Sequence, residues 1–368
     1  MKNELKGLNI PDMSVSAVIR LLSDLYENAL KKDLPLKALP TPFFWGAAGS
    51  GKSEGVYQLA DEIAARTGKK VIVTEVRLLL FAPTDLRGIP VADAEKRFSN
   101  WLMPRIFQMN PGKDQVNLLF LDELSAATQS VQAAAYQLCL DRKVGEFTLP
   151  ENCIVIAAGN RTTDQSVSYK MPKALCNRLM HFNISCDYED WRRWAVQHGV
   201  AQEVIAFLGL DSSRLSVEPE SSDLAYATPR SWTFVSTLIS TLEGPIESIH
   251  PLIAACVGSD AALEFEAFCK GCLHMPPIKD VLSGKCRELP RSHDIMYAMV
   301  SAFVSLLQRE GDRLTESELD NLCSYLVRFP KDFVVTFLKD ATAIPEMDHL
   351  LMRCFSLQSW LSKHKFAL

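Results

Sequence analysis

Apolar residues in the first half of the chain follow two different patterns. Between Ser14 and about Lys32 they recur close to a helical period, which predicts an amphipathic helix. Short runs that are wholly or mostly apolar predict buried strands at residues 43–45, 71–76, 118–121 and 154–158. Because a strand that is apolar on both sides must be covered on both faces, we expect a parallel sheet between layers of helices.

The pattern changes in the second half. From Asp190 onward, apolar residues keep helical spacing with no further strand-sized runs, and no internal repeat is visible. The sequence therefore predicts an α/β first part and a mostly helical second part, with the boundary near Ser185.

Composition narrows the class of protein. Hydrophobic residues make up 48% of the 368 residues, which is enough for compact cores, and 44 acidic against 39 basic residues give a net charge of -5. This charge gives no overall attraction to nucleic acid or to an anionic membrane. No run approaches the roughly 20 apolar residues that a membrane-spanning helix needs, and the first twenty residues carry charges instead of a secretory signal. We expect a cytoplasmic protein without membrane insertion.

Ten cysteines are scattered without the spacing of a disulfide framework, as expected for a reducing compartment. One group has the spacing of a metal site: Cys269 and Cys272 form a C-x-x-C pair, and His274, Cys286 and His293 follow. Cys269 also falls on a predicted helix, so these residues are either zinc ligands or buried thiols.

The strand at 43–45 runs directly into a Gly-rich segment with the pattern G-x-x-x-x-G-K-S. The segment consists of Gly46, Ala47, Ala48, Gly49, Ser50, Gly51, Lys52 and Ser53. Glycines let successive backbone N–H groups face a phosphate, while the lysine reaches the β- and γ-phosphates and the serine hydroxyl binds Mg²⁺. This pattern predicts a P-loop that binds ATP with Mg²⁺.

The strand at 118–121 ends in two acids, Asp122 and Glu123. We expect Asp122 to hold the Mg²⁺ shell and Glu123 to orient the attacking water. Taken alone, the two acids could simply cap a helix, but together with a P-loop upstream they form a Walker B pattern.

These motifs resemble those of the AAA+ ATPase superfamily, and of its MoxR-like family in particular. The resemblance is carried by residues 46–53, 120–123, 157–160 and 174–179, in that order. It implies a P-loop α/β subdomain with a parallel sheet at 1–185 and a helical lid at 186–250. Residues 251–368 are then a helical C-terminal extension without a recognisable motif.

The resemblance also implies roles for three further residues. Asn160 matches the sensor 1 residue that positions the water, Arg178 the arginine finger that acts on a neighbouring subunit's nucleotide, and Arg230 the sensor 2 residue of the lid. Without the resemblance, Asn160 reads as a turn residue and Arg178 as half of a surface ion pair. Pro229 suits a first helical turn, which places Arg230 at the start of a helix.

The resemblance finally implies partners. Relatives form hexameric rings that remodel a protein client, often with a partner that carries a von Willebrand factor A domain. A long insert around residues 83–104 and a hairpin at 142–147 are candidates for client contact. One alternative is a switch that binds ATP without turnover. The other is a nucleic-acid-dependent motor, whose basic lining could come from Arg87, Lys96, Arg97, Arg142 and Lys143, although acidic residues are interleaved with them.

Overall fold

The computed structural model describes residues 10–161, 169, 171–242, 244–272, 275–342, 344 and 347–364. Contacts within the chain divide it into two compact units, Met1–Asp187 and Tyr188–Leu368. The first unit is α/β and the second is helical, so the predicted fold class is confirmed. The further division of the helical half at residue 250 remains a prediction.

The first unit contains a six-stranded parallel sheet in the order β1-β10-β2-β9-β6-β3. Its strands are β1 Asp12–Met13, β2 Thr41–Trp45, β3 Lys70–Arg77, β6 Gln115–Asp122, β9 Cys153–Gly159 and β10 Leu179–Ile184. Two small antiparallel pairs are β4 Ile89–Ala92 with β5 Ser99–Leu102, and β7 Lys143–Val144 with β8 Phe147–Thr148. The helices of this unit are α1 Val15–Lys31, α2 Lys52–Thr67, α3 Pro83–Arg87, α4 Gln129–Asp141 and α5 Lys173–Cys176. The predicted first helix and four predicted strands are therefore confirmed, with small shifts at their ends. The predicted burial of the strand at 71–76 is wrong, because β3 is an edge strand in which only Val76 is buried.

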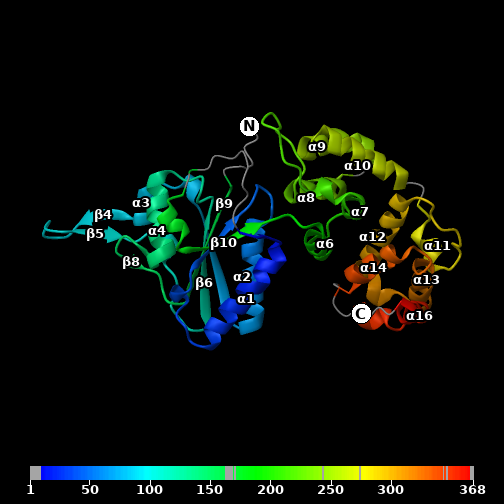
Figure 1. The fold of residues 1–368 in the computed structure, drawn as a ribbon, viewed down its shortest axis with the longest axis horizontal. Helices are drawn as coiled ribbons and strands as arrows, with labels where there is room; N and C mark the ends of the chain where they lie inside the picture. The colour runs from blue at the N-terminus through cyan, green and yellow to red at the C-terminus, as the bar shows by residue number, and fades with distance from the viewer. Residues whose placement is uncertain are drawn as a thin grey trace. The chain divides into compact units, whose positions relative to one another are not determined.

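Helices cover both faces of the sheet (Figure 1). Successive residues of a strand point to opposite faces, so Phe44 packs with α1 and α2, while Phe43 packs with α3, α4 and α5. All central strands are buried on both sides, as the continuous apolar runs predicted. The layered packing fixes the direction of β2 and thereby the place where the Gly-rich segment leaves the sheet.

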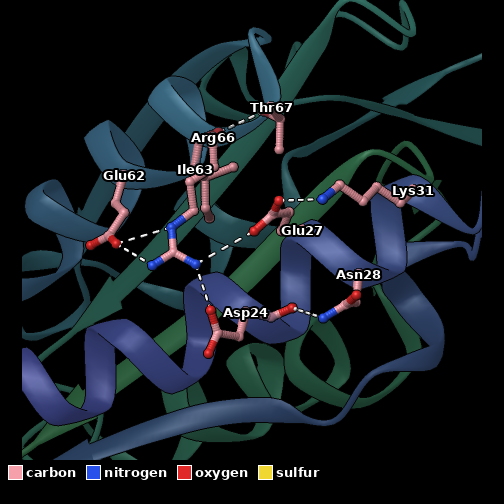
Figure 2. Close-up of polar contacts among 8 residues, drawn as sticks. All are labelled: Asp24, Glu27, Asn28, Lys31, Glu62, Ile63, Arg66 and Thr67. Atoms are coloured by element: carbon pink, nitrogen blue, oxygen red, sulfur yellow. Dashed lines mark hydrogen bonds and ion pairs between the residues drawn. The ribbon is translucent and has the colours of Figure 1, made fainter.

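Helix α1 is attached to α2 through an apolar face and an ionic surface. Val15 and Ile19 lie within contact distance of Gly55 on α2, where a glycine lets the two helices approach closely. At the rim, Arg66 of α2 donates to Asp24 and Glu27 of α1 and to Glu62 of its own helix (Figure 2). These side chains are partly exposed, so their ion pairs contribute little, and the apolar contact holds the helices together.

The β4–β5 hairpin projects away from the sheet (Figure 1) and fills the long insert that the sequence placed at 83–104. Its large apolar side chains are exposed: Ile89 by 63%, Phe98 by 70% and Leu102 by 60%. Several large apolar side chains exposed on one element are a common feature of interaction sites.

The second unit is a bundle of helices around one continuous hydrophobic core. Its helices are α6 Tyr188–Gln197, α7 Gln202–Leu210, α8 Pro229–Thr241, α9 Ile246–Val257, α10 Ser259–Cys272, α11 Ile278–Leu282, α12 His293–Glu310, α13 Glu316–Leu326, α14 Lys331–Ala341, α15 Met347–Leu351 and α16 Phe355–His364. Within this core, a buried ion pair joins Arg192 of α6 to Asp340 of α14 at 2.5 Å. No helix in the described part of the chain is long and apolar enough to cross a membrane.

Candidate nucleotide-binding site

The Gly-rich segment connects β2 to α2 at the carboxyl edge of the sheet. Gly49 and Gly51 have φ values of +77° and +91°, in the left-handed region that residues with a side chain rarely adopt. A Cβ atom on Gly46 would lie 2.8 Å from the Ser50 hydroxyl oxygen, so a larger residue would displace Ser50. The segment therefore has the curled backbone of a phosphate-binding nest.

Lys52 opens α2 and is buried, with its ammonium group turned onto the loop. It donates to the carbonyl oxygens of Gly46 and Ala47 at 2.7 and 2.8 Å, and to the Asn160 side-chain oxygen at 3.0 Å. These three oxygens hold the Lys52 ammonium against the loop. A bound phosphate oxygen would replace them as its acceptor.

The two acids at the end of β6 are held in different ways. Asp122 accepts the Glu123 backbone N–H at 2.9 Å with one oxygen and the Ser53 hydroxyl at 3.3 Å with the other. Burial raises the pKa of Asp122, while the Glu123 N–H and the nearby Lys52 charge act in the opposite direction. Glu123 has φ +59°, a strained conformation for a residue with a side chain, and such strain is common at functional sites.

Strand β9 lies between the P-loop strand β2 and the Walker B strand β6, so Asn160 emerges between Lys52 and the two acids. Ser125 fixes the backbone of Asn160 from both sides: its hydroxyl accepts the Asn160 N–H at 2.9 Å and donates to the Asn160 carbonyl at 3.1 Å. A Cβ atom on Gly159 would lie 2.6 Å from the Ser125 hydroxyl oxygen, so glycine is needed for this approach. Sequence reasoning missed Ser125, and its position two residues after Glu123 is the only signal that could have indicated it.

The residues that are present fit a triphosphate with Mg²⁺. The Ser50 hydroxyl oxygen is buried inside the loop without a hydrogen-bond partner among the described residues. The loop N–H groups and Lys52 suit the phosphates, and the Ser53 hydroxyl with the Asp122 carboxylate provides oxygen ligands of the kind that Mg²⁺ prefers.

Arg178 lies away from this cluster within the first unit, and Arg230 belongs to the second unit. Arg178 is exposed and precedes β10, whose first residue Leu179 is in register with Thr41 at the start of β2. The P-loop leaves β2 at its other end, so Arg178 lies roughly 15 Å away along the strand direction at about 3.3 Å per residue. Arg230 is exposed on the first turn of α8 in the second unit, and its contact with nucleotide stays a prediction.

The expected basic surface of the second hairpin needs a correction. Arg142 is buried, because its guanidinium donates to the Thr41 hydroxyl at 2.7 Å and to backbone carbonyls, among them that of Leu39 at 3.0 Å. It therefore closes the end of α4 against β2 and cannot face a nucleic acid. Lys143, the next residue, is exposed.

The proposed zinc ligands are only partly described. Among the described residues, no group of three or more His, Cys, Asp or Glu side chains could hold a metal ion. Cys269 lies on α10 as expected and packs against the core of the second unit. The thiol of Cys286 contacts the Tyr325 hydroxyl at 3.8 Å, while His274 and the side chain of Cys272 lie outside the described residues.

Strand β2, the phosphate-binding nest and helix α2 follow one another along the chain. Two acids stand at the end of β6, which β9 separates from β2. This arrangement defines a P-loop α/β fold. Comparison with protein-family models gives no match, and neither does comparison with curated protein sequences. Solved structures do match, at low similarity. PCH-2 of C. elegans is 14% identical with a TM-score of 0.37, over 70% of this chain and 68% of that chain. A mutant of Thermotoga maritima RuvB is 14% identical with a TM-score of 0.39, over 74% and 76%. The ORC2 protein of Aeropyrum pernix is 12% identical with a TM-score of 0.39, over 98% and 97%.

Proposed function

We propose that the chain is a Mg²⁺-dependent ATPase of the AAA+ type, which hydrolyses ATP to ADP and phosphate. The observation that carries this proposal is the meeting of Lys52, Asp122 and Asn160 at one edge of the sheet. They come from three separate segments of the sequence, and hydrogen bonds link Lys52 to Asn160 and Ser53 to Asp122. If Lys52 served only in a structural ion pair, neither the curled Gly-rich backbone nor the Asn160 amide would be needed beside it.

Each group has a defined task in this proposal. The loop N–H groups and Lys52 bind the phosphates, and Ser53 with Asp122 holds the metal ion. Mg²⁺, when bound, neutralises charge on the β- and γ-phosphate oxygens. Glu123 orients and polarises the attacking water, and the Asn160 amide, fixed by Ser125, positions that water beside it.

The position of Arg178 supports a site shared between subunits. At roughly 15 Å along the strands from its own P-loop, Arg178 is too far away to reach a phosphate bound there. An exposed arginine at the opposite end of the sheet can instead complete the site of a neighbouring copy. We therefore propose a ring of six subunits, as in MoxR-like ATPases, in which Arg178 acts in trans.

The projecting β4–β5 hairpin supports a protein client. It exposes several large apolar side chains, and the Arg97 guanidinium at the tip pairs with Glu95 instead of standing free. Lys96, between these two residues, is also exposed. A nucleic-acid motor needs a basic lining, and Arg142 is buried. We propose that the hairpin contacts a protein client, and that a protein with a von Willebrand factor A domain is the partner.

The experiment that tests the shared site is the mass in solution of the Glu123→Gln variant, measured by light scattering with and without Mg-ATP. Because this variant keeps the binding groups and loses the water-orienting carboxylate, it should hold the ATP-bound state. We expect a shift from the subunit mass of 41.1 kDa to roughly six times that value when Mg-ATP is added.

The matched control is the Glu123→Gln variant that also carries Lys52→Ala, which should not shift at the same ATP concentration. A mass that stays at one subunit over the whole accessible concentration range would contradict the trans role of Arg178. The chain would then be better described as a nucleotide switch that acts alone.

A further inference from the structure

A chain of hydrogen bonds joins the strand that leads into the P-loop to the segment that carries Arg178. The indole N–H of Trp45, the last residue of β2, donates to Nδ1 of His181 on β10 at 2.9 Å. Nε2 of the same ring lies 2.8 Å from the backbone carbonyl oxygen of Cys176, the last residue of α5. Since a carbonyl can only accept, Nε2 donates, and the ring is held as the neutral tautomer with its proton on Nε2.

The His181 ring is also held by its aromatic neighbours. It stacks on the Trp45 ring with 6.0 Å between centroids and an interplanar angle of 28°, and it lies 5.9 Å from the Phe43 ring. Phe43 and Trp45 in turn lie 4.4 Å apart. Phe43 is fully buried, so the side of the His181 ring that faces Phe43 is packed against the core of the sheet. Both ring nitrogens therefore have fixed directions.

The bond to Cys176 acts close to Arg178. The carbonyl of Cys176 is one of the last in α5, where no residue of the helix itself can supply a donor. Two residues later, the Arg178 N–H donates to the Leu175 carbonyl at 2.8 Å, and the Leu175 side chain is buried in the core. The peptide groups that lead into Arg178 are thus fixed by the core on one side and by His181 on the other.

We propose that His181 is a positioning residue for Arg178. Through Trp45, His181 connects the segment that carries Arg178 to the strand that enters the P-loop of the same subunit. Its two hydrogen bonds run from the P-loop end of β2 back toward the end of the sheet where Arg178 lies. A shift of the P-loop strand is thereby transmitted to the arginine that completes the neighbouring site. This inference rests on the proposed function, because it requires Arg178 to act on a neighbour's nucleotide.

Mixed assemblies test the inference by ATP hydrolysis. Arg178→Ala subunits keep their own P-loop, Glu123 and Asn160, but offer no arginine to a neighbour. Glu123→Gln subunits offer Arg178 and bind ATP, but do not hydrolyse it. Mixing the two should restore hydrolysis several-fold above the sum of their separate rates, because each Arg178→Ala site can receive an arginine from a neighbouring donor.

The donor then receives a second change. With His181→Phe, the donor keeps an aromatic ring between Phe43 and Trp45 and loses both hydrogen bonds. We expect the restored rate to fall about tenfold, because small misplacements of a group that acts in the transition state have large effects on rate. The KM for ATP and the assembled mass should not change, since the altered donor still assembles and the hydrolysing site belongs to the other subunit.

Two further donors serve as comparisons. Trp45→Phe breaks the same chain from its other end and should give the same deficit, and it decides the question if His181→Phe fails to assemble. His198→Phe is the matched control. His198 also stacks on a tryptophan, with 4.5 Å between the ring centroids, and bonds the backbone carbonyl of Trp194. His198 lies between α6 and α7 of the other unit, and its contacts among the described residues do not include the Arg178 segment, so this donor should restore the full rate.

The outcomes separate the two proposals. If Glu123→Gln restores hydrolysis and the His181→Phe and Trp45→Phe donors restore it equally well, the positioning role of His181 is overturned and the shared site stands. If the unaltered Glu123→Gln donor restores nothing, the shared site is wrong, and the inference about His181 falls with it.

Discussion

At the scale of single residues, the main cation of the site already has hydrogen-bond acceptors within the protein. The Lys52 ammonium donates to two loop carbonyls and to the Asn160 amide oxygen, all between 2.7 and 3.0 Å. Nucleotide binding therefore exchanges one set of oxygen acceptors for another. The free energy of nucleotide binding depends on how much more strongly the Lys52 ammonium interacts with phosphate oxygens than with the oxygens of the loop and of Asn160.

This exchange leads to a prediction about affinity. Lys52→Ala should weaken Mg-ATP binding by about tenfold to a hundredfold, the cost of losing a hydrogen bond to a charged group. Glu123→Gln should leave the dissociation constant within about threefold, because its carboxylate acts on water and not on the phosphates. Titration calorimetry measures both. Equal losses in the two variants would contradict the separate roles of binding and water activation.

The sequence predicted most of the residues that meet at the carboxyl edge of the sheet, because P-loop chemistry requires fixed residue types at fixed spacing. Gly49, Gly51 and Lys52 adopt the conformations that this spacing requires. Ser125 could not be predicted in the same way, since its role depends on Gly159, a residue 34 positions later that only the sheet brings close. The burial of Arg142 is likewise partly a tertiary effect, because two of its acceptors, Thr41 and Leu39, belong to β2 and the segment before it.

At the scale of elements, the contact between α1 and α2 depends on Gly55. A Cβ atom there would lie 2.9 Å from a methyl carbon of Val15, closer than real contacts allow. Gly55 lies one turn beyond Lys52 on α2, so α1 packs directly behind the P-loop. The position of α1 is therefore linked to the start of the helix that receives the phosphates.

Gly55→Ala should lower the free energy of unfolding by about 1–3 kcal/mol through overpacking, and chemical denaturation measures this loss. Gly271→Ala is the matched control. A Cβ atom at Gly271 in α10 meets nothing within 4 Å, so alanine there should be neutral or stabilise by up to about 1 kcal/mol. If both changes have the same effect, helix propensity and not the α1–α2 contact determines the result.

The sequence predicted four strands of the six-stranded sheet and missed the other two, β1 and β10. Runs such as 118–121 are apolar throughout and could only be buried strands. In β10, the polar residues His181 and Asn183 interrupt the apolar pattern, and the strand is recognisable only from its pairing with β2. Register and strand order are properties of long-range pairing, which a local pattern does not contain.

At the scale of the whole molecule, the two units have separate hydrophobic cores. In the helical unit, an ion pair joins Arg192 of α6 to Asp340 of α14, and their side chains are each only 4% exposed. Burial raises the pKa of Asp340 to about 6, against the opposing effect of Arg192. At pH 8 the carboxylate is therefore ionised and paired with the guanidinium.

Asp340→Ala should destabilise the second unit at pH 8 by about 3–5 kcal/mol, because it leaves the Arg192 charge buried without a partner. The double change Arg192→Met with Asp340→Leu removes both charges and should cost less than the single change. Calorimetric unfolding at pH 8 compares them, and a double variant that is less stable than Asp340→Ala would contradict the argument.

The order of the strands has a consequence for how the protein is made. β9 lies between β2 and β6 in the sheet, although it follows both of them along the chain. A nascent chain therefore cannot build the site strand by strand as it leaves the ribosome. Lys52 and Asp122 reach their final positions only after residues 153–159 have entered between their strands. ATP binding would thus report that β9 has entered the sheet, and nucleotide could stabilise the newly made protein only from that step on.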